Sequence, residues 1–211
     1  MSDTNKLQAF TRLHEENEPL LLGNVWDAKT AVLAEQAGFK ALGSSSHAIA
    51  FTLGYPDVES ISFEDLFFVV KRIVQAVKIP VSVDFESGYA EDPTVVAAYV
   101  KQLADIGVVG INLEDGQVQD GKRILGDSKL LVDKIKAIKK VTSIFINARA
   151  DTYTTKHPQA LAESIKRAHA YQEAGADGIF ITLIESKEDI KSFVEHVSLP
   201  LNVFTTPKLP A

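Results

Sequence analysis

Short apolar runs and segments with helical spacing alternate along almost the whole chain. The segments between the runs place apolar side chains three and four positions apart, the spacing of one helix face. This alternation predicts repeated βα units, and the near-continuous apolar runs predict a parallel sheet buried on both faces. Seven runs are predicted to be strands: 20–25, 40–43, 80–84, 108–113, 143–147, 177–182 and 201–204.

Polar residues and glycines mark the ends of several predicted helices. Asp27 and Asp92 stand at N-cap positions, and Gly38 follows the last apolar position of the helix that begins after Asp27. A helix is also predicted at about residues 4–16, before the first strand, and another from about 157 to 174.

The predicted fold is a single (β/α)8 barrel of the TIM type. Residues 1–211 are interpreted as one domain, because no long polar or Pro/Gly-rich linker interrupts the alternation. Charged residues follow several different strands, which favours a closed barrel over an open doubly wound sheet, where the site lies at one switch point. Only seven strands are found, so we expect a barrel that lacks its eighth βα unit in this chain.

Composition narrows the class of protein without naming its chemistry. The 211 residues are 45% hydrophobic and 24% charged, with a formal net charge of −6 and no basic stripe, so no nucleic-acid partner is expected. Neither a membrane-spanning run nor a signal-peptide stretch is found, and we expect a cytoplasmic protein. The absence of cysteine excludes disulfides, thiolate ligands and a cysteine nucleophile.

Three predicted strands end in charged side chains. Asp84 and Glu86 are two apart on an extended chain, so both side chains leave the same face. Buried carboxylates cost several kcal/mol each unless a cation or donors compensate them, so the repeated pattern predicts a divalent metal site opposed by an arginine. The three strand ends carry Asp84 and Glu86, Glu114 and Asp115, and Arg149 and Asp151.

Oxygen ligands favour Mg²⁺, with Mn²⁺ as an alternative. We expect Asp84 to be the direct metal ligand, with Glu86 and Glu114 holding metal-bound water. The alternative is that these acids only cap the turns that follow. Asp115 points to the opposite face and is as consistent with a structural role. Arg149 would grip a carboxylate or stabilise an oxyanion, or else only form an ion pair with Asp151 or Glu114.

A serine-rich turn supplies a second candidate element. Ser45, Ser46 and His47 follow a short strand and would present hydroxyl and N–H groups to an anionic substrate. Asp57 continues the same loop, where it would bind a water or the substrate, or simply form a turn. Phosphate-binding glycine motifs are absent, and no lysine lies at the C-terminal end of a strand, which argues against Schiff-base chemistry.

Five segments carry a resemblance to a known family: 24–28, 53–57, 84–89, 110–115 and 147–151. With these segments in this order, the chain resembles the isocitrate lyase/phosphoenolpyruvate mutase superfamily, in particular its oxaloacetate decarboxylase and carboxyphosphonoenolpyruvate mutase branch. The resemblance implies a (β/α)8 barrel, Mg²⁺ and a pyruvate-type enolate. It also assigns Ser45, Ser46 and His47 to substrate binding, Asp84 to the metal, and Asp57, Glu86 and Glu114 to metal-bound water, with Arg149 gripping the substrate.

Two departures from the family pattern affect the expected chemistry. The lyase branch carries a Lys-Arg-Cys-Gly-His stretch, with cysteine as general acid, in the mobile loop that corresponds to residues 116–126. That stretch is absent here, and Lys122 would either serve instead or be an ordinary exposed lysine. The family's last helix, which is normally exchanged between subunits, is also missing, so the homo-oligomer that the resemblance implies is in question.

The function expected from these observations is a Mg²⁺-dependent lyase or decarboxylase. Its substrate would be a small 2-oxo or 2-hydroxy dicarboxylic acid, and a metal-stabilised enolate would form. Decarboxylation ranks first because it needs no cysteine acid. The alternatives are a phosphonomutase or phosphonate hydrolase that acts on a P–C bond, and a catalytically inactive barrel with a binding or assembly role.

Overall fold

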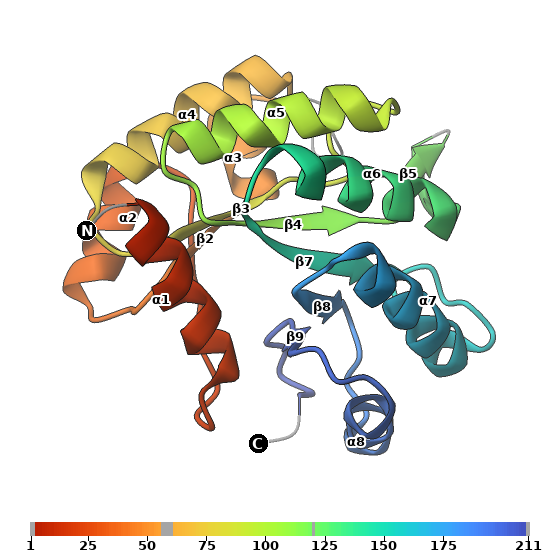
Figure 1. Cartoon of the computed structure of the whole chain (residues 1–211). Coiled ribbons are helices and arrows are strands. Elements are labelled where there is room, and N and C mark those ends of the chain that lie inside the picture. Colours follow the sequence, from red (N-terminus) through yellow and green to blue (C-terminus); the bar gives the residue numbers. More distant parts are fainter. Residues whose placement is uncertain (1–2, 56–60, 120, 210–211) are drawn as a thin grey trace.

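A curled parallel sheet forms the centre of the molecule (Figure 1). The structure is a computed structural model that describes residues 3–55, 61–119 and 121–209. In this part of the chain the sheet has seven strands in the order β1-β2-β3-β4-β7-β8-β9, and every neighbouring pair is parallel. Their bounds are β1 Gly23–Val25, β2 Leu42–Ser44, β3 Val81–Asp84, β4 Gly110–Glu114, β7 Phe145–Ala150, β8 Gly178–Ile181 and β9 Leu201–Val203.

Helices separate successive strands and cover the outer face of the sheet (Figure 1). The Asp27 side chain accepts a hydrogen bond from the Thr30 N–H in a capping box, and the Asp92 side chain caps α5 by accepting the Thr94 N–H, so both residues are N-caps as the sequence predicts. Gly175 ends α7 with φ of 106°, a conformation that favours glycine. The helices are α1 Asp3–Glu15, α2 Ala28–Gln36, α3 Ser46–Thr52, α4 Phe63–Ala76, α5 Pro93–Asp105, α6 Ser128–Val141, α7 Ala160–Ala174 and α8 Lys187–His196.

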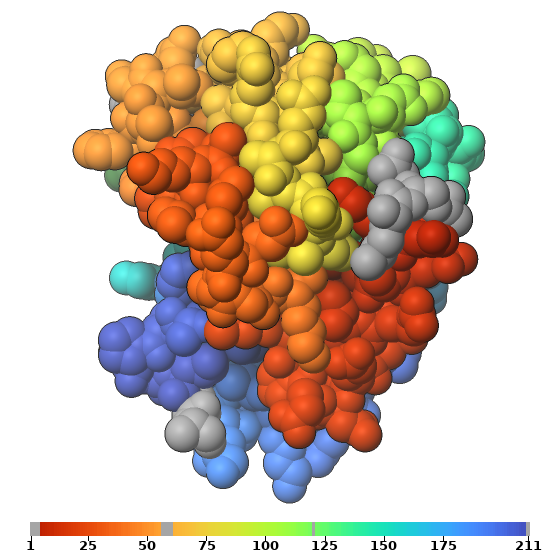
Figure 2. Space-filling view, turned by 90° about the vertical axis from the view of Figure 1, so that its left-hand side faces the viewer, coloured from red at the N-terminus to blue at the C-terminus, as the bar shows by residue number. Residues whose placement is uncertain are grey.

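The N-terminal helix covers the end of the sheet at which the strands begin. Phe10 of α1 is buried in a small cluster with Ala41, Val109 and Phe145, which precede or begin β2, β4 and β7. α1 also lines a surface hollow with the segment between α8 and β9, and Figure 2 shows these red and blue parts of the chain on one face. The opposite end, where the strands finish, is therefore the end open to a ligand.

The segment after β4 differs from its predicted form. The sequence was interpreted as a mobile loop over 116–126, whereas the structure has an antiparallel hairpin of β5 (Gly116–Gln119) and β6 (Lys122–Leu125). Register pairs Gly116 with Leu125 and Gln119 with Lys122. The backbone N–H of Gly126 donates to the Asp115 carbonyl at 2.9 Å, which holds the two ends of the hairpin together.

The parallel curled sheet and its helices confirm the predicted fold class. β1 and β9 are the two edge strands of the sheet in the described part of the chain, and all seven strands of the sheet match the seven predicted runs to within a few residues. Of the helices the structure describes, none combines the length and the apolar character that crossing a bilayer requires.

Candidate active site

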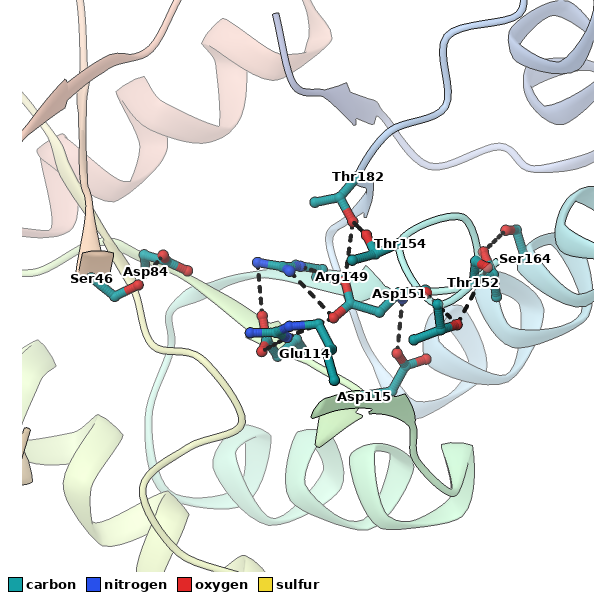
Figure 3. Close-up of polar contacts among 12 residues, drawn as sticks. Ser46, Asp84, Glu114, Asp115, Arg149, Asp151, Thr152, Thr154, Ser164 and Thr182 are labelled. Atoms are coloured by element: carbon teal, nitrogen blue, oxygen red, sulfur yellow. Dashed lines mark hydrogen bonds and ion pairs between the residues drawn. The ribbon is translucent and has the colours of Figure 1, made fainter. Parts of the chain in front are cut away.

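Charged side chains from three strands meet at the C-terminal edge of the sheet (Figure 3). Asp84 ends β3, Glu114 ends β4, and Arg149 lies near the end of β7. Register pairs Glu114 directly with Arg149, and Asp84 with Asn112, two residues before Glu114. Because side chains alternate across a strand, Asp84, Glu114 and Arg149 all leave the same face of the sheet.

Asp84 is held by two serines, Ser44 at the end of β2 and Ser46 at the start of α3. Ser46 donates from its hydroxyl to Asp84 Oδ2 at 2.7 Å, and the Asp84 N–H donates to the Ser44 hydroxyl at 2.9 Å. Asp84 Oδ1 is buried and has no hydrogen-bond partner among the residues that the structure describes. A buried carboxylate oxygen without a partner is costly, so this atom marks a place where a cation would bind favourably.

The other residues of the serine-rich turn have different surroundings. Ser45 is the N-cap of α3, and its hydroxyl accepts the Ala48 N–H at 3.3 Å. His47 is exposed on the first turn of that helix. Of the three residues predicted to bind substrate here, Ser46 is hydrogen-bonded to the site carboxylate Asp84, and the substrate role of all three stays a prediction. Asp57 lies outside the described residues.

Glu86 lies just beyond β3 in an unusual backbone conformation. Its φ is 48°, in the left-handed region that side-chain-bearing residues rarely adopt, and its side chain is buried. The Glu114 N–H donates to the Glu86 carbonyl at 2.8 Å, which ties the turn after β3 to the end of β4. Such strain persists where the surroundings hold it in place, and it recurs at functional sites.

Two guanidinium groups and two carboxylates form a compact cluster beside Asp84 (Figure 3). Arg149 Nε donates to Asp151 Oδ1 at 2.7 Å, and Arg149 Nη2 donates to Oδ2 at 3.2 Å. Arg149 Nη1 lies 2.8 Å from Glu114 Oε2, which has no hydrogen bond of its own. Asp151 thus holds the Arg149 guanidinium in place, and the ion pairs with Asp151 and Glu114 that were considered as the alternative are both present.

The second guanidinium belongs to Arg123, which the sequence analysis missed. Arg123 comes from β6 of the hairpin, and its Nη1 donates to both Glu114 Oε1 and Asp151 Oδ2, the latter at 2.7 Å. Lys122, the hairpin residue singled out from the sequence, is exposed instead. Adjacent residues of a strand face opposite sides. If a hairpin had been predicted, this alternation would therefore have placed Lys122 and Arg123 on opposite faces of it.

Burial dominates the electrostatics of Glu114. It raises the pKa of this carboxyl to about 7, despite the opposing charges of Arg149 and Arg123, and the nearby Asp151 and Asp84 carboxylates act in the same direction as burial. The two guanidiniums lower the pKa of Asp151, although its burial acts in the opposite direction. Burial therefore favours the protonated form of Glu114, whereas the guanidiniums favour the ionised form of Asp151.

Asp115 faces away from this cluster. Its Oδ2 accepts from the Tyr171 hydroxyl at 2.5 Å and from Arg167 Nη1 at 2.9 Å, and its Oδ1 accepts the Asp151 N–H at 2.9 Å. Arg167 also donates to the Gly126 carbonyl at 3.0 Å. Asp115 thus fastens α7 to the hairpin, which agrees with the structural role considered for it.

A cavity of about 540 Å³ lies against Glu114, between the turn after β3, the hairpin and α6. Lys134 of α6 is buried in its wall and donates to the Ser87 carbonyl at 2.7 Å. The volume is within the range typical of small-molecule pockets.

The oxygen donors at this edge fit a hard divalent cation. Among the described residues, no three His, Asp or Glu side chains are close enough to form a ready-made metal cage. Mg²⁺ is commonly bound through one or two carboxylates while it keeps several waters, so a complete cage is not needed. The buried Asp84 Oδ1, which accepts no hydrogen bond from the described residues, is the atom best placed for a direct bond.

Comparison with known proteins gives a consistent family assignment. The chain matches the family model described as phosphoenolpyruvate phosphomutase over residues 10–211. It is 32% identical over 202 residues to an uncharacterized protein of Mycobacterium tuberculosis, covering 95% of this chain and 75% of that protein. It is also 32% identical over 199 residues to 2-methylisocitrate lyase of Halalkalibacterium halodurans, covering 91% of this chain but 65% of that lyase.

Solved structures with the same fold have related names. A candidate phosphonomutase from Burkholderia cenocepacia J2315 superposes with a TM-score of 0.92 at 34% identity, covering 98% of this chain and 87% of that one. 2,3-Dimethylmalate lyase superposes with a TM-score of 0.85 at 25% identity, covering 98% and 74%. Phosphonopyruvate hydrolase, solved with oxalate and Mg²⁺, has a TM-score of 0.84 at 24% identity, covers 94% and 71%, and is a likeness of fold alone.

Proposed function

The chain belongs to the isocitrate lyase/phosphoenolpyruvate mutase superfamily, and from this premise we propose that it is a Mg²⁺-dependent decarboxylase or lyase of a small 2-oxo or 2-hydroxy dicarboxylic acid. The relatives with named activities include lyases and a candidate phosphonomutase, so the prediction of an enzyme is confirmed. The substrate, the metal and a homo-oligomeric, cytoplasmic enzyme are part of the proposal.

The observation that carries the proposal is the buried, unpartnered Oδ1 of Asp84 at the end of β3. Asp84 would hold the metal directly, and Glu86 and Glu114 would accept hydrogen bonds from its waters. When bound, Mg²⁺ would supply positive charge beside the carboxylate and keto oxygens of the substrate. Ser46 keeps the other Asp84 oxygen in place through its 2.7 Å hydrogen bond.

Arg149 supplies the second positive charge. Asp151 holds its guanidinium from one side, and Nη1 lies close to Glu114 Oε2 with no hydrogen bond between them, so the N–H groups of Nη1 would be available to an oxyanion. Breaking the bond to the departing carboxylate releases CO₂ and moves the electron pair into the keto group. The resulting enolate then takes a proton. A donor aimed at that oxygen is worth about 3–4 kcal/mol.

Decarboxylation remains the preferred reaction because the hairpin carries Lys122, Arg123 and Ile124, with no thiol acid among them. The test is release of CO₂ and pyruvate from oxaloacetate in the presence of Mg²⁺. Free Mg²⁺ itself promotes this reaction slowly, so Mg²⁺ alone and Mg²⁺ with the Asp84→Ala variant are the controls. A wild-type rate no greater than these controls would reject the decarboxylase.

A phosphonomutase or phosphonate hydrolase is the second candidate, favoured by the 34% identity to the candidate phosphonomutase over 87% of its length. Phosphorus NMR of phosphonopyruvate incubated with enzyme and Mg²⁺ would show a new resonance if the P–C bond is broken. If calorimetry shows binding of neither Mg²⁺ nor oxalate, a barrel with a binding or assembly role becomes the better description.

A further inference from the structure

The guanidinium of Arg123 is anchored at one nitrogen, and its other edge has no hydrogen bond to the described residues. Nη1 makes both of its hydrogen bonds, to Glu114 and Asp151, while Nε and Nη2 donate to none of the described residues. The Arg123 side chain is 26% exposed, against 15% for Arg149. Nε and Nη2 together form the edge of an arginine that binds a carboxylate or phosphonate in bidentate fashion.

Arg149 is arranged differently. Its Nε and Nη2 edge is already occupied by Asp151, and its Nη1 faces Glu114. The guanidinium of Arg149 is thus held by site carboxylates on both sides, whereas Nε and Nη2 of Arg123 donate to none of the described residues.

The hairpin is shaped to bring Arg123 to this place. Gly116, at the start of β5, has no side chain, and a Cβ there would fall against Asp151 Oδ2 and lie 2.7 Å from Arg123 Nη1. A side chain at position 116 would therefore push apart the contact that anchors the guanidinium. The hairpin base is held by Arg167, which donates to both the Gly126 carbonyl and Asp115. Arg123 is a preorganised group, because its anchoring contacts exist without ligand.

We propose that Arg123 binds the second, distal anionic group of the substrate and so makes the enzyme selective for acids that carry two. This inference rests on the proposed function, in which the first carboxylate lies at the metal and Arg149. The distal group is a carboxylate or a phosphonate, because both accept two parallel N–H bonds from one arginine edge.

The test compares three 2-hydroxy acids that differ in the distal group. Lactate has none, malate has a carboxylate, and 2-hydroxy-3-phosphonopropionate has a phosphonate. None has a keto group to accept electrons from a breaking bond, so decarboxylation does not disturb the measurement. Calorimetry at saturating Mg²⁺ gives each affinity for wild type, Arg123→Gln and Lys122→Gln. Lys122 is the matched control, because it is the adjacent cation of the same strand and is exposed.

For wild type we expect at least one dianion to bind roughly 10- to 100-fold more tightly than lactate, the range for a charged bidentate contact. Arg123→Gln should remove that advantage and leave lactate affinity within about twofold, while Lys122→Gln should change neither. The distal group whose acid loses more affinity on Arg123→Gln identifies the preferred substrate class. Arg123→Lys keeps the charge near Glu114 and Asp151 and should recover only part of the advantage.

Several results would overturn the inference. The first is that Arg123→Gln lowers the affinity for lactate as much as the affinity for both dianions. The second is that the dianions still bind more tightly than lactate in Arg123→Gln, and the third is that they bind no more tightly than lactate in wild type. Binding of oxalate distinguishes a failure of the inference about Arg123 from a failure of the proposed function. If Mg²⁺ and oxalate bind wild type normally, only the inference is wrong. If they do not bind at all, the proposed function is wrong and the inference falls with it.

Discussion

Asp84 is the residue whose replacement tests the metal site most directly. Asp84→Ala removes the buried Oδ1 and should weaken Mg²⁺ binding by more than roughly 100-fold, because changes behind a metal ligand alone often cost 10- to 100-fold. Isothermal titration calorimetry measures this. Asp105→Ala, which removes an exposed carboxylate paired with Lys101 on α5, is the control and should leave the affinity unchanged. Unchanged Mg²⁺ affinity in Asp84→Ala would refute the assignment.

Arg149 separates substrate binding from metal binding. Arg149→Lys keeps a positive charge near Glu114 but loses the planar fork that Asp151 holds, so oxalate affinity should fall by roughly tenfold or more. Mg²⁺ affinity should stay within about twofold of wild type. Both affinities are measured in one calorimetric series, with oxalate added after Mg²⁺. Equal losses of the two would mean that the arginine only maintains the structure.

At the level of single residues, the sequence separated Glu114 from Asp115 by strand alternation, and the structure agrees. Glu114 faces Arg149, while Asp115 contacts Tyr171 and Arg167 of α7. The role of Arg123 could not be inferred in this way, because its place depends on a hairpin that was interpreted as a loop.

Among the elements, α1 carries a titratable group at its contact with the sheet. His14 stacks on Phe145 with ring centroids 4.4 Å apart, and one ring nitrogen lies 2.9 Å from the Phe10 carbonyl. Burial lowers the pKa of His14 below its usual 6.5, because the charged imidazolium is less well solvated there, although the backbone contact opposes this.

His14 should therefore make stability depend on pH in acid. Below pH 6.5 the unfolded chain binds more protons at this residue than the folded one, so the free energy of unfolding should fall as pH decreases from 6.5 through the lower folded pKa. His14→Phe keeps an aromatic ring and should flatten this part of the profile. Urea unfolding between pH 5 and 8 measures it, with exposed His169→Phe as the control. Identical profiles for wild type and His14→Phe would contradict the expectation.

The hairpin is an element that the sequence pattern does not predict. Its strands β5 and β6 are short and mostly polar or charged, and Asp120 and Gly121 between them are as typical of a loop as of a turn. Pairing with each other, and the clamp from Arg167 to Gly126, define this element more than any hydrophobic pattern does.

For the whole molecule, ligand binding should appear as added stability. A ligand that binds only the folded state at 100 times its dissociation constant adds about 2.7 kcal/mol, which for a domain of this size raises Tm by about 5–10 °C. Mg²⁺ with oxalate should produce this shift, and excess EDTA should abolish it. Asp84→Ala is the control for effects of the salts themselves. A wild-type Tm that responds no more than the variant would argue against a site for both ligands.

The order of apolar runs and capped helical segments was sufficient to predict the parallel α/β architecture, because local periodicity and the need to bury both faces of each strand leave few alternatives. It also located Asp84, Glu114 and Arg149 at one edge, since the carboxyl ends of parallel strands come together. The partners of these charges were decided only by the tertiary structure. Arg123 meets Glu114 and Asp151, 9 and 28 residues away, because a hairpin folds back over the strand ends and Gly116 leaves room for the contact.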